Sequence, residues 1–362
     1  MTEFILIDYN FEGVVKLTDN ILSQCSILIF TKDRAHFLNK QVKYWLSENI
    51  NILVADASDF KNKNHFSKNV QYFHLPKQSV LKRMNFLSNK LKTKYFVLCA
   101  DDDFLSISGL KKSLKFLKNN NEYSGCQGRF LTISYPISTP VLLGPHYHYA
   151  DHKHIEDDNV INRLIEINSF PLMLYCYGVF KKSVLNVATK IWSEVETIEG
   201  ANNFFEPIIP IASALTGKFR TLNHFHCARR PCFDHPESPV EVSIKNKTKL
   251  FQKISTNITN LTKNISDKNQ ISGEVLLNIY KNAVDARYRY STNSLTKTNK
   301  IQKEVFIVLI RKIRSLLIRL RLHSTFGVLK SNFDDDVNAY SECQKDWEIE
   351  KVYTCTAKVL YL

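Results

Sequence analysis

The sequence lacks the features that carry a chain out of the cell or across a membrane. It has no uninterrupted run of the ~18 apolar residues that a transmembrane helix needs. Its first residues, MTEFILIDYNFEGVVKL, include acidic side chains where a secretion signal is basic, and their apolar run stops after four residues. We therefore expect a cytoplasmic protein without a transmembrane helix.

The cysteines also lack the spacing of a metal or redox motif. None of the eight forms a CxxC pair, and Cys25, Cys99 and Cys176 lie in or beside apolar, strand-like runs. This placement is typical of reduced thiols in a hydrophobic core.

The sequence does contain a large apolar fraction and an excess of positive charge. Of its 362 residues 44% are hydrophobic, which is enough for one large domain with an accessory region. The formal net charge of +14 indicates an anionic partner, which is a nucleic acid, a phosphorylated small molecule or an anionic membrane surface.

Short apolar runs alternate with amphipathic segments from about residue 24. They predict strands at 26–30, 51–58, 70–75 and 95–100, and helices at 36–46 and 80–91. This order predicts an α/β fold with a mainly parallel sheet flanked by helices. Residues 134–158, with three prolines and four histidines, are predicted to form a loop, and a change to polar composition predicts a domain boundary near residue 240.

The predicted strand 95–100 runs directly into three aspartates, Asp101, Asp102 and Asp103. In an open parallel sheet, ligands bind beyond the carboxyl ends of the strands. Adjacent carboxylates repel one another unless they are solvated or neutralised, and a hard divalent cation accepts such ligands while leaving positions for substrate phosphates. The alternative is that the triplet caps a helix predicted over 106–120.

Four segments in register, SILIFTKDR, ILVADAS, LKRMNFL and YFVLCADDDF, resemble the nucleotide-binding half of the family two glycosyltransferases of the GT-A fold. The resemblance implies a Rossmann-like GT-A catalytic domain at 1–240, built on a mixed, mainly parallel sheet, with a nucleotide-binding half at 24–130 and an acceptor half at 131–240. Residues 241–362 would form a basic, mainly helical C-terminal region. A nucleotide-diphosphate sugar donor and Mn2+ or Mg2+ are implied with the fold.

The resemblance also assigns roles to single residues. The turn after the first strand would hold the base and ribose, the second strand would end at a carboxylate that contacts the base, and an Arg-Asn pair would line the donor pocket. This chain has Ala55 where the family usually has a second acid, and it lacks the usual glycine after the pair. The donor residues implied are Thr31, Asp33, Arg34, Asp56, Arg83, Asn85, Asp101 and Asp102, and the metal ligands implied are Asp103 and Asp101.

The general base is expected at the start of a later helix. Inverting members of the resembled family carry it as the second acid of a pair, about eleven residues before a glycine, and Glu206 stands at this distance from Gly217. Phe205 replaces the first acid. The alternative is that Glu206 only caps the helix, with Glu199 or Glu196 as the base instead.

Three further segments carry predictions. His226 is a candidate third metal ligand or diphosphate contact, and Arg229 a clamp for the leaving phosphates. The histidine-rich segment 146–154 is expected to be a mobile loop near the acceptor rather than a metal site. Residues 302–323 have the pattern of a basic amphipathic helix. We expect this helix either to lie on an anionic membrane or to pack on the catalytic domain.

The resemblance implies a glycosyltransferase of surface polysaccharide synthesis with a glycan or lipid-linked acceptor, and the basic segment 302–323 would attach it peripherally to the plasma membrane. One alternative is a sugar nucleotidyltransferase, but TKDRAHF lacks the glycine of its phosphate loop. The other is a basic nucleic-acid-binding protein, but the Phe and Tyr residues lie mainly in buried-type runs. No nucleic-acid partner is therefore expected.

Overall fold

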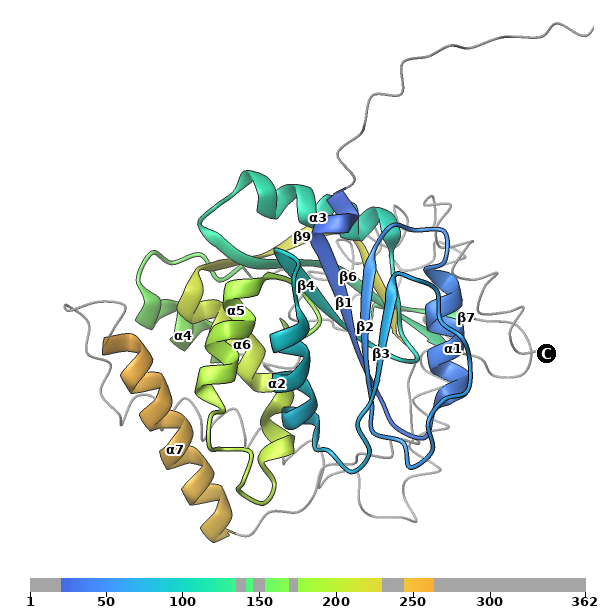
Figure 1. Ribbon diagram of the computed structural model, residues 1–362. Helices are drawn as coiled ribbons and strands as arrows, with labels where there is room; N and C mark the ends of the chain where they lie inside the picture. Colours follow the sequence, from blue (N-terminus) through green and yellow to red (C-terminus); the bar gives the residue numbers. More distant parts are fainter. Residues whose placement is uncertain (1–20, 135–140, 146–153, 169–174, 230–243, 264–362) are drawn as a thin grey trace, which may run out of the picture.

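The computed structural model describes residues 21–134, 141–145, 154–168, 175–229 and 244–263 (Figure 1). Within them one nine-stranded sheet has the order β3-β2-β1-β4-β8-β6-β9-β5, with β7 beside β6. The strands are β1 (Cys25–Thr31), β2 (Asn51–Asp56), β3 (Val70–His74), β4 (Tyr95–Ala100), β5 (Phe104–Leu105), β6 (Tyr123–Ser134), β7 (Val141–Pro145), β8 (Val179–Lys181) and β9 (Lys218–Arg229).

Strand directions divide the sheet into two parts. The strands β3, β2, β1 and β4 are all parallel, and β9 runs parallel to β6. The strand β8 is antiparallel to both β4 and β6, and β5 is antiparallel to β9. The predicted mixed, mainly parallel sheet is confirmed.

Helices cover both faces of this sheet. They are α1 (Ala35–Tyr44), α2 (Val80–Lys90), α3 (Ile107–Asn119), α4 (Val160–Asn168), α5 (Lys182–Ile191), α6 (Phe205–Thr216) and α7 (Ile244–Lys263), with short 3-10 helices η1 (Ile21–Gln24) and η3 (Ala201–Phe204). The buried side chains of α1 and α3 belong to one core cluster. Those of α2, α4, α5, α6 and α7 belong to the other, on the opposite face (Figure 1).

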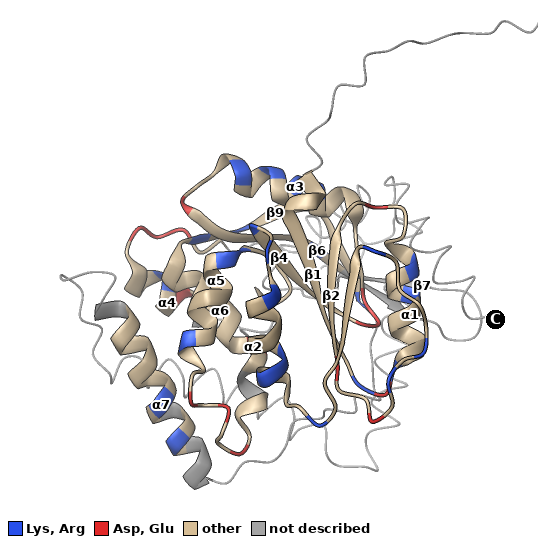
Figure 2. Cartoon of the chain, in the orientation of Figure 1, with Lys and Arg blue, Asp and Glu red and all other residues tan. Residues whose placement is uncertain are grey.

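The central strands are apolar on both faces because each face is covered. Alternate residues of β1 divide between the clusters, with Leu28 in one and Ile27 in the other. The same holds for Leu98 and Val97 of β4. Continuous apolar runs are the pattern of strands buried on both sides. Figure 2 shows β1 and β4 without charge along their length, so charged groups gather where the strands end.

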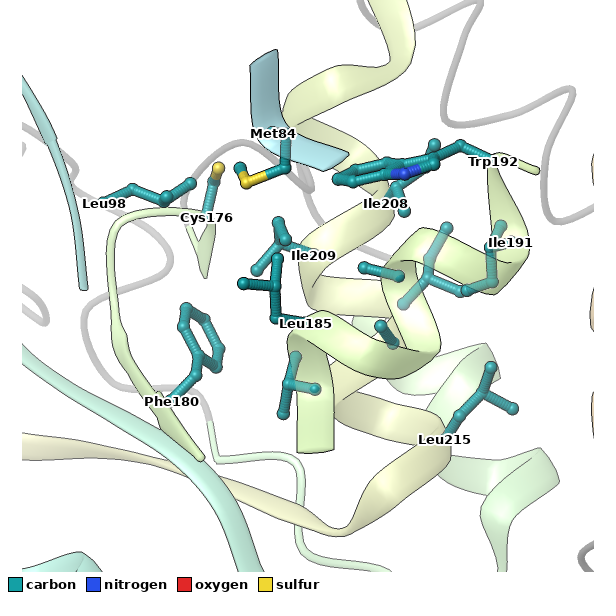
Figure 3. Packing of buried hydrophobic residues seen from close by; sticks show 14 of the residues in the cluster. Met84, Leu98, Cys176, Phe180, Leu185, Ile191, Trp192, Ile208, Ile209 and Leu215 are labelled. Carbon is teal, nitrogen blue, oxygen red and sulfur yellow. The ribbon is translucent and has the colours of Figure 1, made fainter. Parts of the chain in front are cut away.

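The larger core cluster joins the sheet to α5 and α6. Phe180 of β8 and Leu185 of α5 are fully buried, as is Trp192 just beyond α5. In Figure 3 the Trp192 ring lies across Ile208 of α6, and Ile209 and Leu185 point toward one another. This packing holds the first turn of α6 in a fixed position relative to the sheet.

Most predicted elements are confirmed to within two residues, but the predicted loop 134–158 is wrong in part. It contains β7 (Val141–Pro145), which pairs antiparallel to β6. Pro140 and Pro145 bracket the short apolar run, so turn signals dominate the sequence there. Proline is tolerated at the ends of edge strands, where its missing N–H costs no ladder hydrogen bond.

Five described cysteines, including the predicted core thiols, are buried and form no disulfide with one another: Cys25, Cys99, Cys126, Cys176 and Cys227. No described helix combines the length and low polarity that crossing a bilayer requires.

The helix α7 lies beyond the predicted domain boundary near residue 240, yet it packs on the same body. Leu250, Ile254 and Ile258 are fully or almost fully buried in the larger core cluster. The Asn257 side-chain amide donates to the Ile191 carbonyl oxygen at 2.7 Å. The first helix of the C-terminal region therefore belongs to the core of the described fold.

We expect Ile254→Ala to lower the free energy of unfolding by about 2–4 kcal/mol, because it leaves a cavity under α7. Thr256→Ala, on the exposed side of the same helix, is the control and should change it by less than about 0.5 kcal/mol. Urea unfolding measures both. Equal stability of the two variants would contradict the packing of α7 on the core.

Candidate active site

The site forms where three parallel strands end at one edge of the sheet. The last residue of β1, Thr31, is paired with the last residue of β2, Asp56. Phe30, one residue earlier, is paired with Ala100, the last residue of β4. The turns that follow β1, β2 and β4 therefore start side by side, and the aspartate triplet begins in the last of them.

All three aspartates are buried, with 3%, 7% and 2% of Asp101, Asp102 and Asp103 exposed. Arg34, which is also buried, places its Nη1 3.0 Å from Asp101 Oδ1 and its Nη2 2.6 Å from Asp102 Oδ2. Thr31 donates its hydroxyl proton to Asp101 Oδ2 at 2.7 Å. Burial raises the pKa of Asp101 to about 7, although Arg34 and Thr31 act in the opposite direction.

The backbone of the triplet is held from α1. Asp103 N–H donates to the Ala100 carbonyl at 3.2 Å, which closes a turn directly after β4. The side-chain amide of Gln41, fully buried on α1, donates to the carbonyl oxygens of Asp103 at 2.5 Å and Ala100 at 3.3 Å. Of the three carboxylates on this turn, Arg34 pairs with those of Asp101 and Asp102.

The alternative role of the triplet as a helix cap is wrong. The strand β5 separates Asp103 from α3, and the cap of α3 is Ser106. The Ser106 hydroxyl accepts a hydrogen bond from Gly109 N–H at 3.0 Å. The carboxylates of the triplet are therefore not used to cap the helix that follows.

A second arginine reaches the triplet from the far end of β9. Arg229 Nε lies 2.9 Å from Asp103 Oδ2. Its guanidinium also lies over the ring of Tyr177, 4.3 Å from the ring centroid. Tyr177 stands in the segment before β8, and its hydroxyl donates to Glu206 Oε1 at 3.0 Å. These contacts connect Asp103 to Glu206 through Arg229 and Tyr177.

Glu206 lies in the first turn of α6, as predicted, and Gly217 directly follows that helix. A Cβ atom at Gly217 would lie 2.6 Å from the Glu122 carbonyl oxygen, so only glycine lets the chain pass this close to β6. Phe205 stands where the resembled family has its first acid. Its ring packs edge-on against Phe30, with 5.4 Å between centroids. With Phe205 in place of this acid, α6 and the end of β1 are joined by an aromatic contact.

The carboxylate at the end of β2 is buried within a local network. Asp56 Oδ1 accepts from Ser58 N–H at 2.8 Å, and Oδ2 accepts from the Tyr72 hydroxyl at 2.6 Å. The Ser58 hydroxyl in turn accepts from Asp33 N–H at 2.7 Å. Asp33 has φ of 54°, in the left-handed region that aspartate tolerates better than most residues. Asp56 thus ties together the turns after β1 and β2.

The Arg-Asn pair of α2 divides between two environments. Arg83 is fully buried, and its Nη1 donates to the carbonyl oxygens of Thr31 at 3.1 Å and Ala55 at 3.2 Å. Arg83 therefore holds the ends of β1 and β2 together through their main-chain carbonyl groups. Asn85 is half-buried on the same helix. The donor-pocket roles predicted for these two residues stay predictions.

The predicted set of three protein metal ligands is not assembled. His226 is fully buried; its Nε2 lies 2.9 Å from the Tyr177 carbonyl oxygen, and its ring packs against Phe130. Burial lowers the pKa of His226 to about 4. Among the described residues no group of three or more His, Cys, Asp or Glu side chains converges as metal ligands. His226 is buried because it lies in β9 where that strand meets β5, and the Ser106 N–H donates to the His226 carbonyl oxygen at 2.8 Å.

Several predictions concern residues outside the described ranges. They include most of the histidine-rich segment, at 146–153, and the basic helix at 302–323. The segment after Arg229 also lies outside them, from 230 to 243.

The sequence matches no known family model and no curated protein sequence. Its structure is similar to that of residues 1–349 of TarS from S. aureus, with a TM-score of 0.50 and 12% identity over 87% of this chain and 88% of that one. A longer TarS structure has the same TM-score and identity, and covers 75% of this chain and 45% of that chain. The chain therefore has a Rossmann-like α/β fold similar to that of the glycosyltransferase TarS. The 1–349 fragment in complex with UDP-GlcNAc has a TM-score of 0.49 and 13% identity, over 87% of this chain and 89% of that one.

Sequence reasoning missed two residues that organise the site. Tyr177 occurs in LYCYGVF, which indicates only an apolar strand, and Gln41 occurs on a helix among other polar residues. The only signal for Gln41 was its place on the apolar face of α1, between the buried residues Leu38 and Val42. A buried amide needs hydrogen-bond partners, so such a position indicates a structural or functional contact.

We expect Arg34→Met to lower the free energy of unfolding by about 3 kcal/mol or more, because two buried carboxylates lose their shared cation. The control is Arg220→Met. Arg220 pairs with Glu156, but their side chains are 39% and 29% exposed, so the cost should be about 1 kcal/mol or less. Urea unfolding at neutral pH measures the difference, and equal losses would contradict the role of Arg34.

We expect His224 to make the fold sensitive to acid. Its Nε2 lies 3.1 Å from Ser113 Oγ, and burial lowers its pKa from 6.5 to about 3. The unfolded chain therefore binds a proton below pH 6.5 that the folded chain does not, so the stability present above pH 6.5 is lost as pH falls toward 3. His224→Gln should reduce the slope of unfolding free energy against pH by up to about 1.4 kcal/mol per unit. The exposed His65→Gln is the control, and an unchanged slope in His224→Gln would contradict the effect.

Proposed function

We propose that this protein transfers a sugar from a nucleotide-diphosphate donor to a hydroxyl group of a glycan or glycolipid, with inversion at the anomeric carbon. The observation that carries the proposal is the run of contacts from Asp103 through Arg229 and Tyr177 to Glu206. It brings the acid expected to face the donor diphosphate and the acid expected to activate the acceptor into one site. The fold, similar to that of TarS, supports this class of enzyme.

The donor would lie across the ends of β1, β2 and β4, where an open parallel sheet binds its ligands. Thr31, Asp33 and Arg34 line the turn after β1, and Asp56 lies beside them at the end of β2. Arg229 is partly exposed, with its guanidinium at the edge of the triplet. A planar guanidinium with several donors suits the diphosphate that leaves the sugar.

The acidic triplet suits a hard divalent cation that takes only one or two of its ligands from the protein. Mg2+ is usually bound through one or two carboxylates together with substrate phosphates and water. Asp103 and Asp101 offer such oxygen atoms, and their burial beside other carboxylates favours an added positive charge. At Asp103 the cation would take the place now held by Arg229. When bound there, Mn2+ or Mg2+ would neutralise charge on the departing diphosphate.

Glu206 is proposed as the general base. It lies in the first turn of α6, where the helix dipole favours a negative charge. In the reaction the hydroxyl proton of the acceptor moves to the Glu206 carboxylate. The acceptor oxygen forms a bond to the anomeric carbon, and the bond from that carbon to the diphosphate oxygen breaks. Attack from the face opposite the diphosphate inverts the configuration.

The acceptor is proposed to be a glycan or lipid-linked saccharide of surface polysaccharide synthesis. A lipid-linked acceptor would lie at an anionic membrane, to which the basic segment 302–323 would attach the protein peripherally.

We expect two site variants to separate donor binding from transfer. Asp103→Asn should lose the thermal stabilisation that Mn2+ and a nucleotide sugar together give the wild type. Glu206→Gln should keep this stabilisation but lose about 10²- to 10⁴-fold in turnover, because only the base is removed. The measurement is release of nucleoside diphosphate from a panel of UDP- and GDP-sugars, with thermal unfolding in parallel.

The exposed residues Asp59 and Glu122 give matched controls, as Asp59→Asn and Glu122→Gln. Both should behave as the wild type. Turnover by Asp103→Asn and Glu206→Gln at the rate of these controls would rule out the site.

A further inference from the structure

We propose that Tyr177 is a positioning residue: it orients the Glu206 carboxylate and connects it to the charged groups at Asp103. The proposal rests on the function proposed above, in which Glu206 is the base. It adds a residue that no sequence pattern indicates, and it assigns this residue an effect on the rate rather than on donor binding.

Three separate contacts meet at Tyr177. Its hydroxyl donates to Glu206 Oε1 at 3.0 Å. Its main-chain carbonyl oxygen lies 2.9 Å from His226 Nε2. Its ring faces the Arg229 guanidinium at 4.3 Å, and Arg229 is paired with Asp103. A tyrosine satisfies all three because it has a hydroxyl at one end, an aromatic face in the middle and its backbone at the other.

The segment that carries Tyr177, residues 175–178, is packed in the core and leads directly into the sheet. Tyr175 and Cys176 are fully buried, and Gly178 N–H donates to the Tyr175 carbonyl at 3.4 Å. A Cβ atom at Gly178 would lie 3.0 Å from the Cys126 carbonyl oxygen of β6. The next residue, Val179, starts β8 between β4 and β6. The phenol therefore points from a fixed backbone, which is what orienting another side chain requires.

The phenol remains a proton donor over the working range of pH. Burial, and next the negative charge of Glu206, raise the pKa of Tyr177 well above its usual range. A protonated phenol beside a carboxylate can only donate to it. The hydrogen bond from Tyr177 therefore fixes the orientation of the Glu206 carboxylate before any acceptor binds.

A second tyrosine in the chain forms a similar group away from the candidate site, at the starts of β6 and β9. The Tyr123 hydroxyl donates to Glu156 Oε1 at 2.8 Å, and the Arg220 guanidinium lies 5.2 Å from the Tyr123 ring centroid. There the arginine pairs with the same glutamate. At the site the arginine instead pairs with a different acid, Asp103, so Tyr177 stands between two carboxylates rather than closing a local ion pair.

The experiment compares the same deletion at both tyrosines. Tyr177→Phe removes the hydroxyl but keeps the ring under Arg229, and Tyr123→Phe removes an equivalent hydroxyl–carboxylate hydrogen bond elsewhere. Each is made alone, and Tyr177→Phe is also combined with Glu206→Gln. The readouts are kcat and KM for nucleoside diphosphate release from the best UDP- or GDP-sugar of the panel in Mn2+, with thermal unfolding of every variant.

We expect Tyr177→Phe to lower kcat about tenfold or more, the effect of losing a hydrogen bond to a charged group, while KM for the donor stays within about twofold. Tyr123→Phe should keep the wild-type kcat. In the Glu206→Gln background, Tyr177→Phe should cause no further loss, because residues that act through one another are not additive.

The outcomes separate the two proposals. A wild type that turns over none of the nucleotide sugars overturns the proposed function, and this inference with it. An active wild type whose Tyr177→Phe variant matches Tyr123→Phe in kcat overturns the inference alone. Additive losses in the double variant, or a loss confined to KM, also overturn it, since a structural contact or a donor contact would then explain the tyrosine.

Discussion

Three carboxylates buried at the end of one strand make the neutralisation of negative charge the main constraint on this structure. An ionised carboxylate out of water is costly unless it is paired and hydrogen-bonded. Arg34 pairs with the first two aspartates and Arg229 with the third. Because these arginines stand at the start of α1 and the end of β9, the requirement fixes both elements relative to β4.

The same requirement explains why the site is built from both halves of the sheet. The parallel strands supply the carboxylates and the turn after β1. The strand β9 pairs with β5, which directly follows the triplet, and this pairing places Arg229 beside Asp103. Tyr177 comes from the segment before β8, which lies between the two halves. A donor with a negatively charged diphosphate would meet the guanidinium groups of Arg34 and Arg229, which are already paired with the aspartates.

The proposed chemistry depends on separating two acidic functions within a short distance. Asp103 lies among arginines, where its charge is shared, whereas Glu206 lies at a helix start and receives a hydrogen bond from a neutral phenol. Different surroundings allow carboxylates in one site to take different roles. The packing of α6 against α5 and Phe30 keeps that separation constant.

The helix start at Glu206 was expected from a family resemblance. Sequence patterns alone determined the strands β1 to β4, the helices α1 to α3 and the edge of the sheet at which the aspartate triplet lies. These follow from local periodicity and from turn and cap chemistry, which act over a few residues. Tertiary structure alone decided that His226 enters the core, that Arg34 and Arg229 neutralise the triplet, and that Tyr177 reaches Glu206. Those contacts join residues far apart in the chain, and only the pairing of β9 with β6 and β5 and the packing of α6 bring them together.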